Sequence, residues 1–148
     1  IFSYLLPSLV RSAAPPPEFA VTLWRELRRV SVVSVSLAIA AWLLASNLLP
    51  ALSKATYITH LPMLPWILLS FVVFSIGMVP HYGLYALRRD RLNIYLNGTA
   101  AMIFLGSCAV IRLPDASLVV PISLCLAMAV FTALKTASCY VMLPRAVS

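Results

Sequence analysis

Charged residues are scarce in this sequence, and acidic residues are the scarcest. Asp, Glu, Lys and Arg make up 10% of the chain, and only four of these residues are acidic. A soluble domain has about 25% charged residues and about 45–50% apolar residues, whereas hydrophobic residues make up 62% of this sequence. These proportions exclude an ordinary soluble domain and indicate a membrane protein.

The residues needed for common catalytic sites are also missing. The four acids, Glu18, Glu26, Asp90 and Asp115, lie in expected linkers and loops and do not pair on one face. There is no glycine-rich phosphate loop and no HExxH or GxSxG motif. The three cysteines lie in apolar runs without CxxC or Cys/His spacing, so we expect them to pack without a disulfide or a metal. The sequence therefore predicts no enzyme, no cofactor and no metal site.

Four apolar runs are long enough to cross a bilayer as helices. The predicted spans are about 30–49, 61–87, 92–111 and 118–143, which gives an all-α, polytopic membrane protein. Pro80, together with Gly77 and Gly83, should kink the second span, because proline removes a helical hydrogen bond.

The residues before the first span have a different character. Residues 11–29 form a polar linker with three consecutive prolines, and its second half, 19–29, can form a short interfacial helix. The sequence starts at Ile1 rather than at a methionine, and residues 1–10 are too short to span. We expect residues 1–10 to be the end of a truncated helix, and the chain to be a piece of a longer protein.

The basic residues alternate between the two sides of the predicted topology. One side holds only Lys54 and Arg112, and the other holds Arg11, Arg25, Arg28, Arg29, Arg88, Arg89, Arg91 and Arg145. The positive-inside rule makes the arginine-rich side cytoplasmic, so residues 11–29, 88–91 and 145–148 should be cytoplasmic. Orientation and anionic lipid headgroups explain the net charge of +7, and we predict no nucleic-acid partner.

Lys135 is the one charge well inside a predicted span. A charged residue in a span marks a pathway or a binding site by default, but a long lysine stem can also snorkel to the interface. A second polar stripe lies on the kinked helix at spacing i, i+4, i+7. The two sets could together line a vestibule open to the cytoplasm, made of Lys135, His81, Tyr85, Arg88, Asn93 and Asn97.

Two of these residues leave alternatives open. For His81 the alternatives are an interhelical hydrogen bond and a proton-coupling role. For Arg88, with Arg89 and Arg91, they are a topological anchor and contact with a lipid phosphate.

The run VPHYGLYALRRDRLNIYLNGTAAMIFLGSCAVIRLP (79–114) resembles a segment of prokaryotic polysaccharide exporters, in which a kinked helix meets a basic turn and then a helix that opens with Asn. LLPSLVRSAA (5–14) resembles the helix end that precedes the cytoplasmic linker in the same proteins. Across nearly the whole chain, the order of elements resembles the C-terminal polysaccharide-biosynthesis region of O-antigen-type lipid-linked oligosaccharide flippases.

This resemblance implies a transporter of two lobes, with these four helices in the second lobe and the first lobe as a missing partner. It implies translocation of an undecaprenyl-diphosphate-linked oligosaccharide across the bacterial inner membrane by alternating access, with H⁺ or Na⁺ as the coupling ion. In this resemblance, Lys135 and Arg88 are the cations that would face the diphosphate. Two other classes stay open: a multidrug or cation antiporter of the same superfamily, and a non-transporting four-helix membrane subunit.

Overall fold

The described part of the chain consists of helices and short connections. The computed structural model describes residues 16–51 and 60–142. Its elements are α2 (Pro16–Ala51), the 3-10 helix η1 (Leu61–Met63), α4 (Leu64–Ala86), α5 (Asp90–Val110), the 3-10 helix η2 (Ala116–Leu118) and α6 (Val119–Met142). Four helical segments are long and apolar enough to cross a membrane, and the described ranges contain no strand. The predicted fold class, an all-α multi-pass membrane protein, is confirmed.

The later predicted spans match the observed helices closely, and the first does not. Spans predicted at 61–87, 92–111 and 118–143 agree within a few residues with η1–α4, α5 and η2–α6. The interfacial helix predicted at 19–29 and the span predicted at 30–49 are instead one continuous helix, α2, of 36 residues. Prolines at its start stand in the first turn, where no helical N–H bond is lost. The predicted linker is therefore helical from Pro16 onward, and the truncated helix expected at 1–10 lies outside the described residues.

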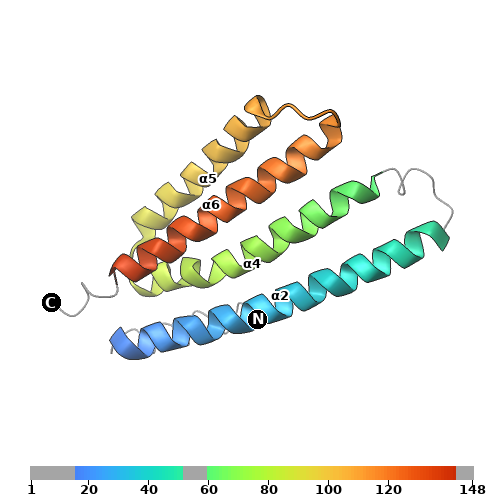
Figure 1. Ribbon diagram of the computed structural model, residues 1–148. Helices are drawn as coiled ribbons and strands as arrows, with labels where there is room; N and C mark the ends of the chain where they lie inside the picture. The colour runs from blue at the N-terminus through green and yellow to red at the C-terminus, as the bar shows by residue number, and fades with distance from the viewer. Residues whose placement is uncertain (1–15, 52–59, 143–148) are drawn as a thin grey trace.

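The long helices lie side by side in the order α2, α4, α6, α5 (Figure 1). Helix α4 packs against α2 on one side and against α6 on the other, and α5 packs mainly against α6. The start of α2, the α4–α5 turn and the end of α6 lie at the same end of the molecule (Figure 1). We call this the basic end, because it carries all the described arginines except Arg112: Arg25, Arg28, Arg29, Arg88, Arg89 and Arg91.

The core lies toward the basic end, where three helices meet. Phe19, Leu23 and Val30 of α2 pack with Val79 and Leu84 of α4 and with Cys139 of α6. Gly83 permits this close approach, since a Cβ at this position would lie 3.3 Å from both Cys139 Sγ and Leu23 Cδ1.

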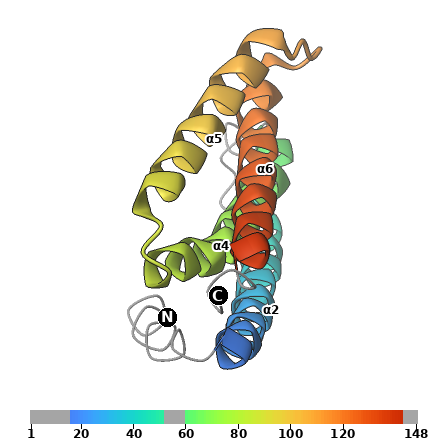
Figure 2. The same cartoon turned by 90° about the vertical axis from the view of Figure 1, so that its left-hand side faces the viewer.

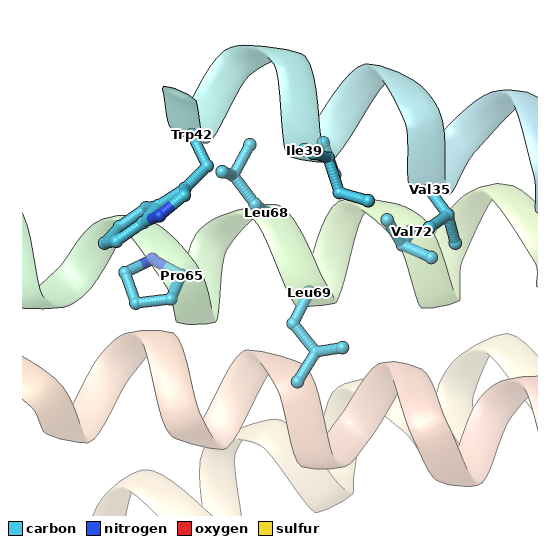
Figure 3. A pocket seen from close by; sticks show the side chains of 8 residues that line it. Val35, Ile39, Trp42, Pro65, Leu68, Leu69 and Val72 are labelled. Carbon is cyan, nitrogen blue, oxygen red and sulfur yellow. The ribbon is translucent and has the colours of Figure 1, made fainter. Parts of the chain in front are cut away.

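Toward the other end, an apolar groove of about 370 Å³ runs between α2 and α4 (Figure 3). Its wall on α2 includes Val35, Ile39 and Trp42, and its wall on α4 includes Pro65 and Leu68. Many apolar side chains on this half of α2 are exposed, as expected for a helix that faces lipid or further helices.

Several hydrogen bonds join α4 to α6, and two of them are accepted by backbone carbonyls of α4, at Val73 and at Pro80. Thr132 Oγ1 donates to the carbonyl of Val73 at 3.0 Å, and Cys139 Sγ donates to the carbonyl of Pro80 at 3.3 Å. Pro80 has no N–H, so the carbonyl of Ile76 loses its usual helical partner. Figure 2 shows the last turns of α4 turned away from the direction of α2 and α6, as the predicted kink requires.

Candidate functional site

Lys135 belongs to the buried face of α6. Residues at four-residue intervals along this helix, Ser123, Ala127, Phe131, Lys135 and Cys139, are all buried. Residues four apart share one face of a helix, so this row is the surface that α6 turns toward its neighbours. Lys135 has none of its surface exposed, although it stands seven residues before Met142, about 10 Å along the helix axis.

The Lys135 ammonium bonds to side chains from two other helices. It contacts Nδ1 of His81 on α4 and donates to Oδ1 of Asn97 on α5 at 2.9 Å. It also lies 3.8 Å from the ring centroid of Phe131, in cation–π contact. When Lys135 is protonated it can only donate, and Nδ1 of His81 is then the acceptor, with the ring proton on Nε2. We call Lys135, His81, Asn97 and Asn93 the cationic cluster.

Two more of the predicted residues surround His81. Asn93 is 1% exposed and lies close enough to the His81 side chain for a weak hydrogen-bonding interaction, but neither its amide nitrogen nor its oxygen makes a hydrogen bond of full geometry among the described residues. The ring of Tyr85 stands edge-on to the His81 ring, with 5.0 Å between centroids, and is 44% exposed. The predicted polar stripe of α4 therefore meets the predicted asparagines of α5 around one lysine.

The contacts of Lys135 distinguish between the two interpretations of its charge. The side chain does not snorkel toward the basic end, because its ammonium is held sideways by α4 and α5. It also has no acidic partner, since the one ion pair among the described residues joins Arg25 to Glu26 near the start of α2. The cluster is therefore a buried positive charge surrounded by neutral hydrogen-bonding groups.

Arg88 does not belong to this cluster. Helix α4 ends at Ala86, and Arg88 has a left-handed backbone with φ of 55°, so the spacing i, i+4, i+7 from His81 does not continue along a helix. Arg88 is exposed and lines a separate hollow of about 530 Å³ with Arg89, Asp90, Arg91, Leu92 and Tyr95. The prediction that Arg88 shares a helical stripe with His81 and Tyr85 is wrong, because the helix ends first.

Sequence reasoning missed Phe131, which contacts the Lys135 ammonium, and an apolar groove between α4, α5 and α6 that Phe131 helps to line. Phe131 lies four residues before Lys135, a spacing that allows a cation–π pair on one helix face, but nothing in the sequence distinguishes it from the other apolar residues of the span. Ser123 was also missed; its hydroxyl is buried without a partner within the described residues. In this part of the chain, no three His, Cys, Asp or Glu side chains come together as a metal site.

The fold and the cluster define a class of protein. The chain is an all-α, multi-pass membrane protein with a buried cationic cluster between three of its helices. No protein-family model, curated protein or solved structure matches it.

Proposed function

We propose that the chain is part of a flippase that moves an undecaprenyl-diphosphate-linked oligosaccharide across the bacterial inner membrane. The observation that carries this proposal is Lys135, a buried cation that no carboxylate neutralises among the described residues. A diphosphate cannot cross hydrocarbon without partners for its charge, so a flippase must offer cationic groups inside the membrane. The resemblance of 79–114 to polysaccharide exporters supports the same substrate.

The energetic cost of the buried lysine supports a functional role. An unpaired charge in a low-dielectric environment costs several kcal/mol, and neutral hydrogen-bond partners recover only a part of this. A side chain that served packing alone would be replaced by an apolar one at lower cost. An anionic ligand in contact with Lys135 would supply the missing countercharge, and the charge-assisted bond would be stronger than those to His81 and Asn97.

The charge distribution supports an orientation for this transport. With the basic end in the cytoplasm, as the positive-inside rule requires, the cationic cluster lies in the cytoplasmic half of the membrane. An inward-facing transporter would collect its lipid-linked substrate from this side. The first lobe of the protein and a coupling ion, H⁺ or Na⁺, complete the proposed machinery.

Two alternatives make different demands on the chain. A cation antiporter of the same superfamily needs an acidic site inside its spans, and among the described spans the only acid beyond Glu26 is Asp90, at the first residue of α5. A non-transporting four-helix subunit needs no buried charge. Neither alternative makes use of an uncompensated lysine, and we therefore favour the flippase.

The test compares Lys135→Ala with Lys135→Arg in the complete reading frame that contains this chain, expressed in cells that lack their own flippase. Delivery of lipid-linked glycan to the cell surface is measured at matched protein levels in the membrane. Arg112→Ala is the control, because it also removes one positive charge but lies at the opposite end.

We expect Lys135→Ala to lose delivery, Lys135→Arg to retain a large part of it, and Arg112→Ala to leave it unchanged. Full delivery by Lys135→Ala would contradict the proposal. An unmodified protein that delivers no glycan, but exports cationic drugs, would instead support the antiporter.

A further inference from the structure

An apolar groove of about 290 Å³ begins at the cationic cluster. It is bounded by α4, α5 and α6, through Phe74, Asn97, Ala100, Ala101, Phe104, Leu124, Met128 and Phe131. Two of its lining residues also touch the lysine: Asn97 accepts a hydrogen bond from Lys135, and Phe131 lies under its ammonium. The groove and the cluster are therefore continuous.

The groove extends in one direction from the cluster, away from the basic end. On α5 it runs from Asn97 to Phe104, and on α6 from Phe131 back to Leu124, each about 10 Å along the helix axis. Phe74 on α4 is likewise farther from the basic end than His81. A lipid of the leaflet at the basic end has the same arrangement, with its head toward that end and its hydrocarbon toward the middle of the bilayer.

Two asparagines near the polar end of the groove can make further hydrogen bonds. Asn93 lies four residues before Asn97 on α5 and is almost completely buried beside His81, and apart from a weak interaction with that ring its amide makes no hydrogen bond of full geometry among the described residues. Asn97 is exposed, so its carbonyl could give up its place on Lys135 to an incoming anionic oxygen. A phosphate at this point would receive bonds from the lysine ammonium and from the asparagine amides, which suits its several acceptor oxygens.

We infer that the cationic cluster and this groove form one binding site for a single-chain lipid phosphate, with the head at Lys135, Asn97 and Asn93 and the chain between α4, α5 and α6. This inference rests on the proposed role of Lys135 as an anion site, and it adds where the isoprenoid chain lies. Among the described residues, the groove between α4, α5 and α6 meets the cluster, whereas the groove between α2 and α4 lies toward the other end. A single-chain polyprenyl phosphate therefore fits better than a two-chain phospholipid.

The test measures binding of three lipids to the purified full-length protein in nanodiscs of neutral lipid. The probes are a polyprenyl diphosphate, the uncharged polyprenol, and phosphatidylglycerol. Ala101→Phe fills the groove at an exposed position, so it should not disturb the core. Ala109→Phe makes the same change on α5 at an exposed residue that does not line this groove, and it is the matched control.

We expect the polyprenyl diphosphate to bind about tenfold more weakly to Ala101→Phe, because the chain loses apolar contact, and to bind unchanged to Ala109→Phe. Lys135→Met should weaken the diphosphate and leave the polyprenol unaffected. The unmodified protein should prefer the polyprenyl diphosphate to phosphatidylglycerol.

Each other outcome has a distinct meaning. If Lys135→Met weakens binding and Ala101→Phe does not, the chain lies elsewhere and this inference fails, while the proposed function stands. Equal binding of phosphatidylglycerol or of polyprenol overturns the single-chain phosphate site. If the polyprenyl diphosphate does not bind the unmodified protein, both the inference and the proposed function fail.

Discussion

Helix α4 lies close against α6 at Gly77, and this contact gives a quantitative prediction. A Cβ on Gly77 would overlap Thr132 Oγ1 and lie 3.3 Å from two carbons of the Phe131 ring. The same Thr132 oxygen is fixed by its hydrogen bond to the carbonyl of Val73. Gly77→Ala must therefore push the helices apart or turn the threonine away from its acceptor.

The expected cost follows from these contacts. Overpacking by one methyl group costs about 1–3 kcal/mol, and the higher helix propensity of alanine offsets up to about 1 kcal/mol of it. Gly77→Ala should therefore lower the free energy of unfolding by about 1–2 kcal/mol. Thr132→Ala alone loses one interhelical hydrogen bond, about 0.6 kcal/mol in a membrane protein. The double variant has no Oγ1 to collide with, so its cost should be well below the sum.

The assay is a double-mutant cycle on the free energy of unfolding, measured by reversible denaturation in mixed micelles. We expect a coupling energy of at least about 1 kcal/mol, larger than the 0.3–0.5 kcal/mol scatter of independent sites. The control is Gly98→Ala, since a Cβ at Gly98 meets no atom within 4 Å; it should be neutral or stabilising. Additive costs for Gly77→Ala and Thr132→Ala would refute the proposed packing.

Three further predictions concern other parts of the chain. Asn93→Leu removes two buried polar atoms that make no hydrogen bond of full geometry among the described residues, so the free energy of unfolding in the same assay should stay unchanged or rise by about 1 kcal/mol; a fall would show that the contact of Asn93 with His81 is stabilising. In a Cys108→Ser/Cys125→Ser variant, which removes the two partly buried thiols, the fully buried Cys139 should react with a maleimide only after unfolding, judged by intact mass; labelling of this variant while folded would contradict the packing of Cys139. The side chain and then the backbone N–H of Ser117 hold the pKa of Asp115 below its ordinary value, so Ser117→Ala should raise this pKa in an NMR titration of the carboxyl carbon. Because the pKa of Asp115 is lower in the folded protein, its ionised carboxylate stabilises the fold at neutral pH, and this contribution is lost as the pH falls through the folded pKa. If Ser117→Ala left the titration of Asp115 unchanged, the Ser117 hydroxyl would be excluded as the cause.

Hydropathy predicted the later helices well because length and apolarity decide which segments can span a membrane. The charge of Arg25, Arg28 and Arg29 suggested a boundary at residue 30, but arginine is a good helix former and does not end a helix. The run therefore continues as α2 from Pro16. Composition shows where a helix passes from a polar to an apolar environment, but it does not show whether the helix is interrupted there. In α2 it is not interrupted.

The sequence predicted most residues of the candidate site, but it did not predict which of them contact one another. Lys135 stood out because charge is costly inside a span, and the asparagines of α5 stood out for their spacing. Their pairing depends on how each helix is rotated about its axis, and no sequence period fixes the rotation of α6 against α5. Arg88 was misplaced for a local reason, since its left-handed backbone follows the end of α4.

The order of the helices in space has a consequence for the assembly of the protein. The central pair, α4 and α6, is separated in the chain by α5, so α4 is synthesised two helices before its main partner. Until α6 arrives, His81 lacks Lys135, and the carbonyls of Val73 and Pro80, which lie inside α4, lack the second donors that α6 supplies. Helix α4 is then in the membrane without the contacts that fix its polar side. Insertion of α6 is thus the step that completes the central pair, and a chain that stopped after α5 would leave His81 without Lys135.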